Sequence, residues 1–133
     1  MSIFVLKPIK FPSETKQSFY ELVVNPVGDL KDKGQLTEFE KELELRYVNE
    51  LTKIYAYMEF DANGNHPPTN KLKELSGVTD GVKEYEYRSK HLRIYCIKSP
   101  NGKTVILGGL KSNQTRDLRA FRALKNQYLN SLK

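Results

Sequence analysis

The sequence predicts an α+β fold: a mainly antiparallel sheet of about four strands, a long N-terminal helix packed on it, and a helix at the C-terminus. Three patterns lead to this prediction. Side chains alternate in character through residues 82–98, residues 105–110 are apolar without alternation, and apolar side chains recur every three or four positions through residues 36–58. These patterns are typical of two half-buried strands, one central strand and one amphipathic helix.

The length and the cysteine content fit a single domain. A chain of 133 residues can bury a core without covalent links, and its one cysteine, Cys96, falls on an expected core face. We expect residues 1–18 to form an N-terminal arm or an extra strand, and residues 19–130 to form the core. No stretch reaches the ~18 apolar residues of a membrane span, and the first residues lack secretion-signal features. We therefore expect a cytoplasmic protein with no membrane partner.

The N-terminal half predicts one strand and one long helix. Residues 19–25 are β-branched and aromatic and end at Asn25-Pro26, which predicts a strand. The helix is expected over residues 36–58, where Thr37 and Glu40 have the spacing of a capping box. Residues 69–76, stopped by Gly77, indicate a short helix or helical turn.

Residues 82–98 predict a hairpin that turns at Ser89-Lys90. Its register would place Arg88 opposite His91, Glu86 opposite Arg93, and Glu84 opposite Tyr95. One face would carry these six residues, and the other would carry Tyr85, Tyr87, Leu92, Ile94 and Cys96. The second face indicates a core, and the first is a candidate functional surface. A simple cross-strand ion pair between Glu86 and Arg93 is the structural alternative.

The C-terminal part predicts a turn, a strand and a helix. Ser-Pro-Asn-Gly at 99–102 has a turn signal, residues 105–110 fit a central strand, and residues 115–132 carry a helical apolar stripe flanked by basic residues.

Charge is unevenly distributed along the chain. Residues 83–133 hold 12 Lys and Arg against 3 Asp and Glu, whereas residues 1–82 hold 10 against 13. A basic half favours a polyanionic partner, with a solvated surface or an acidic protein partner as the alternatives. The two histidines, His66 and His91, lie far apart, so we expect no metal site, and no motif implies a cofactor.

Four segments of the C-terminal two thirds carry a family resemblance. They read KLKELSG at 71–77, EYEYR at 84–88, LRIYCI at 92–97 and VILGGLK at 105–111, after a strand and a long helix and before a terminal helix. In order and spacing they resemble the RelE/ParE toxin superfamily, specifically its HigB-like, phage-derived branch. The resemblance covers roughly residues 19–130 and implies a RelE-like fold.

The resemblance implies a toxin of a type II toxin–antitoxin system. Such a protein would cleave messenger RNA on the ribosome without a metal, by attack of a ribose 2′-hydroxyl on the adjacent phosphate, and its partners would be a cognate antitoxin, the ribosome and messenger RNA. The positions matching the family's site residues are Arg88, Arg93, Lys111 and Glu86, with His91 as the alternative base. RNA-binding residues would be Lys71, Lys73, Lys90, Gln114 and Arg116.

Two alternative functions stay open, the second of them because of one departure from the family's pattern. Many members carry paired lysines after the last strand, where this chain reads Lys111-Ser112-Asn113. The alternatives are a ParE-like inhibitor of DNA gyrase, and a catalytically inactive nucleic-acid-binding or interaction module of the same fold.

Overall fold

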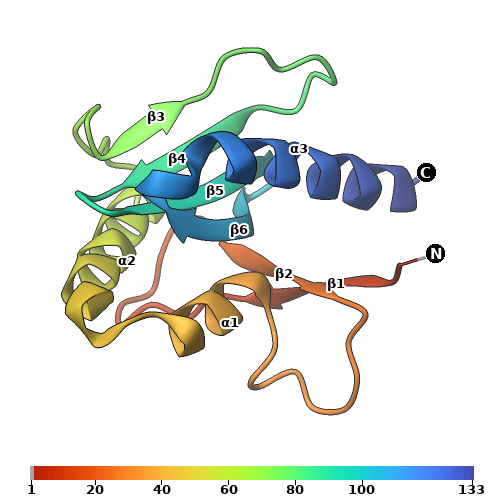
Figure 1. Cartoon of the computed structure of the whole chain (residues 1–133), viewed down its shortest axis with the longest axis horizontal. Coiled ribbons are helices and arrows are strands. Elements are labelled where there is room, and N and C mark those ends of the chain that lie inside the picture. Colours follow the sequence, from red (N-terminus) through yellow and green to blue (C-terminus); the bar gives the residue numbers. More distant parts are fainter. Residues whose placement is uncertain (1) are drawn as a thin grey trace.

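A computed structural model describes residues 2–133 as one mixed sheet with helices on both faces (Figure 1). The elements follow one another as β1 (Phe4–Pro8), β2 (Tyr20–Val24), α1 (Gln35–Glu42), a 3-10 turn (Leu45–Tyr47), α2 (Val48–Ala62), β3 (Leu72–Glu74), β4 (Glu84–Arg88), β5 (Leu92–Ser99), β6 (Gly102–Leu110), a second 3-10 turn (Lys111–Asn113) and α3 (Gln114–Ser131).

The sheet corrects the predicted fold. The class is α+β, but the sheet has six strands in the order β1-β2-β6-β5-β4-β3, not about four. It is mixed, because β2 pairs with β6 in parallel while the other pairs are antiparallel. The two additional strands, β1 and β3, lie at the edges of the sheet, where short segments can pair on one side only.

The prediction of one long helix over residues 36–58 is also wrong, because two shorter helices, α1 and α2, form there. Leu43 and Glu44 are both extended, with ψ near 134° and 141°, so the chain turns between α1 and α2. The apolar period continues through this break, which is why the sequence alone reads as one helix. α1 packs on β2 and β6, where Gly108 leaves room for the Phe39 ring, while α2 packs on β4.

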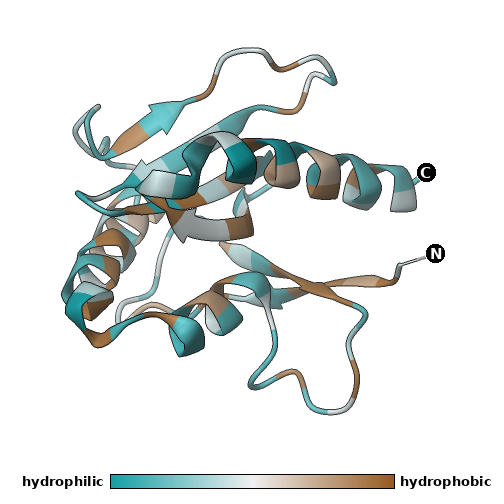
Figure 2. Ribbon diagram, viewed as in Figure 1, coloured by the Kyte–Doolittle hydropathy of each residue, from teal (hydrophilic) through white to brown (hydrophobic). Residues whose placement is uncertain are grey.

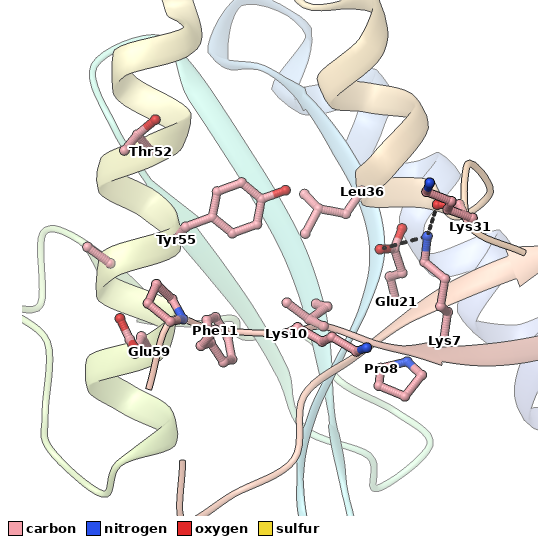
Figure 3. Close-up of a pocket in the computed structure, with 13 residues that line it drawn as sticks. Lys7, Pro8, Lys10, Phe11, Glu21, Lys31, Leu36, Thr52, Tyr55 and Glu59 are labelled. Carbon is pink, nitrogen blue, oxygen red and sulfur yellow. Dashed lines mark hydrogen bonds and ion pairs between the residues drawn. The ribbon is translucent and has the colours of Figure 1, made fainter. Parts of the chain in front are cut away.

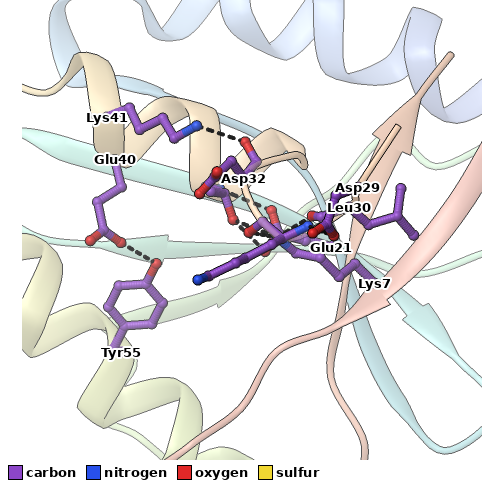
Figure 4. A network of polar contacts seen from close by, with 10 residues as sticks. Lys7, Glu21, Asp29, Leu30, Asp32, Glu40, Lys41 and Tyr55 are labelled. Carbon is purple, nitrogen blue, oxygen red and sulfur yellow. Dashed lines mark hydrogen bonds and ion pairs between the residues drawn. The ribbon is translucent and has the colours of Figure 1, made fainter. Parts of the chain in front are cut away.

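α1 is capped by a distant strand. Gly34 precedes the helix and has no side chain to cap it, and the predicted capping residue Thr37 lies inside the helix. Instead Glu21 of β2 accepts hydrogen bonds from the Thr37 amide and hydroxyl, both at 2.9 Å, while Lys7 of β1 lies 3.7 Å from the same carboxylate (Figure 4). A carboxylate at this position also stabilises the positive end of the helix dipole.

Residues 72–74 form β3, preceded by a turn at residues 69–71, where a short helix or helical turn was expected over residues 69–76. Leu72, Lys73 and Glu74 pair with β4, and the Arg88 amide donates to the Lys71 carbonyl at 2.8 Å. Pairing with the free edge of β4 outweighs the weak helical preference of this short segment.

Other expectations are confirmed. β2, α3 and the central strand β6 form as predicted, Ser99 pairs with Gly102 across a tight turn, and the Cys96 side chain is buried.

Each face of the sheet has its own core. α1 and α2 cover the face that carries Tyr87, Ile94 and Cys96, and α3 covers the face that carries Tyr95 and Ile97. The helices alternate between apolar and polar residues along their turns (Figure 2), as expected for helices that bury one side. Within residues 2–133, no helix is both long enough and apolar enough to span a membrane.

Candidate functional site

The β4–β5 hairpin has the predicted faces but a different register. Arg88 pairs with Arg93 and Glu86 with Tyr95, so the predicted pairing of Arg88 with His91 is wrong by two residues. The loop is longer than the expected two residues, and the Ser89 amide donates to the Leu92 carbonyl at 3.1 Å. Because the shift is even, the paired strand residues stay on their predicted faces. His91, in the loop, leaves the predicted charged face, because its side chain contacts Glu50 and Tyr47 on the α2 side of the sheet.

α3 covers much of the charged face of this hairpin. Glu84 is 2% exposed and lies within 2.9 Å of both Lys125 and Arg122 of α3. Glu86 is 1% exposed and accepts a hydrogen bond from Gln114 of α3 at 2.6 Å. The carboxylate of Glu86 therefore faces protein groups, and its geometry suits positioning of neighbouring side chains.

The two arginines of the hairpin differ in access. The Arg93 side chain is 5% exposed, and its Nη1 donates to the carbonyls of Ser89 at 2.6 Å and Leu92 at 2.8 Å. Burial lowers the pKa of Arg93, and Glu86 opposes that effect. Arg88 is 29% exposed, with its Nε 3.1 Å from Glu86. Arg93 thus holds the loop together, whereas Arg88 is open to a ligand.

His91 and Glu50 form a histidine–carboxylate pair at the tip of the hairpin. His91 Nδ1 lies 2.7 Å from Glu50 Oε2, and the His91 amide donates to Glu50 Oε1 at 2.8 Å. Ser89 Oγ donates to the same Oε1 at 2.5 Å. Burial acts to raise the pKa of Glu50, but the hydrogen bonds from Ser89 and His91 outweigh it, so the pKa lies below its usual value. Because the carboxylate accepts from Nδ1, the proton of a neutral ring sits there, and Nε2 is left as a proton acceptor.

The histidine opens into a cavity of about 330 Å³. Its lining is Tyr47, His91, Leu110, Lys111 and Ser112. The Lys111 amide donates to the His91 carbonyl at 2.8 Å, and the Tyr47 ring lies 5.0 Å from the imidazole. A base, His91, and a lysine, Lys111, therefore line one solvent-accessible space, which lies where the start of α2, the hairpin tip and the end of β6 meet.

The remaining residues expected to bind RNA surround this end of the sheet. Lys90, Lys73 and Arg116 are exposed, while Lys71 is partly buried, with its ammonium 5.9 Å from the centre of the Tyr57 ring. Lys73 in the edge strand β3 pairs with Glu86, and Lys71 precedes that strand opposite Arg88, whereas Lys111 is exposed and lines the cavity.

Sequence reasoning missed Glu50, Tyr47 and Ser89. Glu50 and Tyr47 precede the hairpin by about 40 residues, and both fit a solvated or core face of a helix. The site is recognised by the hydrogen bond between His91 and the Glu50 carboxylate, and this contact is visible only in the tertiary structure.

Residues 2–133 contain no group of three or more His, Cys, Asp or Glu side chains placed to hold a metal ion. No protein-family model matches the chain, and neither the curated proteins nor the solved structures include a match.

Proposed function

We propose that this chain is the toxin of a type II toxin–antitoxin system and acts as a ribosome-dependent, metal-independent messenger RNA endoribonuclease. The observation that carries the proposal is the His91–Glu50 pair beside Lys111, in an open cavity at the basic end of the sheet. The resemblance of residues 19–130 to the HigB-like branch of the RelE/ParE toxins supports the same conclusion.

The proposed base is His91. Its Nε2 accepts the proton of a ribose 2′-hydroxyl, and Glu50 stabilises the imidazolium that forms. The 2′-oxygen then bonds to the adjacent phosphorus as the bond to the 5′-oxygen breaks, leaving a 2′,3′-cyclic phosphate. The departing 5′-oxygen takes a proton from solvent. Glu86, the other candidate base, is 1% exposed and holds Arg88 and Gln114 in place.

The proposed phosphate ligands are Arg88 and Lys111. Arg88 is partly exposed and oriented by Glu86, so its guanidinium can pair with two phosphate oxygens. Lys111 stabilises the negative charge that develops on the phosphate. Arg93 acts as a positioning residue, because its hydrogen bonds to the Ser89 and Leu92 carbonyls fix the loop that presents His91. Lys71, Lys73, Lys90 and Arg116 would bind the RNA backbone around the site.

The test is induction of the protein in bacteria, with primer extension on cellular messenger RNA. The wild type is expected to arrest growth and to produce new cuts within translated messages, and His91→Ala is expected to reduce cleavage about 10²- to 10⁴-fold. His66→Ala is the matched control, because His66 is exposed in a distant loop and should leave cleavage unchanged.

Three outcomes contradict the proposal. Growth arrest with intact messages and damaged or relaxed DNA would identify a gyrase inhibitor. Cleavage that survives His91→Ala would move the chemistry away from the histidine. A folded protein that neither arrests growth nor cuts RNA would identify an inactive binding module.

A further inference from the structure

A second cavity, whose lining shares no residue with the cavity at the hairpin tip, lies beside the N-terminal arm. It has a volume of about 950 Å³ and is bounded by residues 7–12 of the arm, by the start of α1 and by one side of α2 (Figure 3). Most of its wall is apolar, with Phe11, Leu36, Tyr55 and Ala56 among the lining side chains. Sites for small organic molecules have this character, with volumes of roughly 300–1,000 Å³ and a few placed polar groups.

Hydrogen bonds hold the arm that borders this cavity, residues 7–13, at both of its ends. At one end Lys7 donates to the carbonyls of Leu30 and Lys31, both at 3.2 Å, and to Thr37 at 3.1 Å. At the other end the amide and the hydroxyl of Ser13 donate to Glu59 of α2 at 2.9 and 2.5 Å. Pro8 and Pro12 stiffen the segment between these ties, since proline fixes one backbone torsion. The cavity is therefore preformed, and a ligand has little ordering entropy to overcome.

Tyr55 ties the two helices across the cavity. Its hydroxyl donates to Glu40 of α1 at 2.7 Å, and burial together with this carboxylate raises its pKa, so the hydroxyl stays protonated. That bond links α1 to α2 over the space between them and leaves the aromatic ring as part of the apolar wall.

The charges around the cavity are not balanced. Glu21 pairs with Lys7 and accepts hydrogen bonds from Thr37, and Glu59 accepts hydrogen bonds from Ser13. Lys10 and Lys31 also line the cavity, are exposed, and have no hydrogen-bond or ion-pair partner for their ammonium groups within residues 2–133. Figure 3 places both ammonium groups on the side of Glu21 and Lys7, opposite Phe11 and Glu59. One end of the space therefore carries the ammonium groups of Lys10 and Lys31, and the other carries the Phe11 ring and the Glu59 carboxylate, which is bonded to Ser13.

We propose that this cavity binds an amphipathic carboxylate, with the apolar part against Phe11, Leu36 and Tyr55 and the carboxylate at Lys10 and Lys31. The volume of about 950 Å³ lies within the range of small-molecule sites, so we take a small molecule as the occupant. This site is separate from the hairpin tip and does not depend on the proposed ribonuclease activity.

The test is calorimetric titration of the full chain with dodecanoate, with dodecan-1-ol as the uncharged probe. Saturable one-to-one binding of dodecanoate is expected, with weaker binding of the alcohol. Ala56→Trp should abolish binding, because it fills the cavity from the exposed surface of α2, where a large side chain leaves the core intact. Lys10→Glu with Lys31→Glu should weaken dodecanoate binding about tenfold or more and leave the alcohol unchanged.

The matched control is Lys16→Glu with Lys53→Glu, which changes the net charge equally at exposed positions outside the lining. Circular dichroism melting verifies that each variant is folded. The inference is overturned if dodecanoate does not saturate, if folded Ala56→Trp binds as tightly as wild type, or if both double variants lose the same affinity. Binding of an acidic amphipathic peptide without binding of dodecanoate would also overturn it and assign the surface to a protein partner.

Discussion

Glu50 links α2 to the hairpin tip, so its removal tests the site directly. Its carboxylate accepts three hydrogen bonds, at 2.5 Å from Ser89 Oγ, 2.8 Å from the His91 amide and 2.7 Å from His91 Nδ1. Hydrogen bonds to charged groups contribute about 1.5–3 kcal/mol each, but they are not additive, and this side chain is 20% exposed. We expect Glu50→Ala to lower the free energy of unfolding by about 2–3 kcal/mol.

The assay is urea denaturation followed by circular dichroism, repeated between pH 4 and pH 7. The lowered pKa of Glu50 makes its contribution complete above the unfolded-state value near 4.5, and the contribution is lost as the pH falls through the folded-state value. The difference between wild type and Glu50→Ala should therefore be fully present above about pH 4.5 and should shrink as the pH falls below that value toward 4.

The matched control is Glu44→Ala, because the Glu44 side chain is 62% exposed and, among the residues that the structure describes, forms an ion pair with Arg46 alone. It should cost less than about 0.5 kcal/mol. The reasoning is refuted if Glu50→Ala costs no more than this control, or if its cost does not change with pH. Glu50→Gln should retain part of the stability and still lose RNA cleavage, since an amide cannot stabilise an imidazolium as a carboxylate does.

Three further predictions concern the fold. Lys125→Met should lower the free energy of unfolding, measured by urea denaturation, by about 3 kcal/mol, because Lys125 is 1% exposed and bonds to two carboxylates. The control Arg119→Met, on the exposed side of α3, should lower it little, and equal losses would contradict a stabilising role of the buried ion pairs. Gly34→Ala should lower the free energy of unfolding by on the order of 3 kcal/mol, since φ is 126° and a Cβ there would lie 1.9 Å from the Glu21 carboxylate oxygen. The control Gly28→Ala, at φ 72° in open space, should lower it by about 1 kcal/mol, and the reverse order of the two losses would refute the argument. The Cys96 thiol should resist a disulfide reagent in the native protein and react on unfolding, because burial raises its pKa, and fast native labelling would disprove this.

Local patterns determined several elements before any tertiary information. The alternation in residues 82–98 identified the apolar and charged faces of the hairpin, and the uninterrupted apolar run identified β6 as central. Face assignment has a period of two, so it survives a shift of two residues in register. The register itself depends on the loop, whose conformation is fixed by Arg93 and by Glu50 from another element.

The sequence by itself therefore determined the α+β class, most strands, the terminal helix and the chemical character of the hairpin. The tertiary structure decided which charged residues are accessible: α3 buries Glu86, Arg93 bonds to loop carbonyls, and His91 opens into a cavity beside Lys111. It also decided the two edge strands and the break between α1 and α2, because these follow from pairing and packing with distant segments. Local propensity is a sum over neighbouring residues, whereas access, pairing partners and hydrogen-bond acceptors are set by segments far away in the chain.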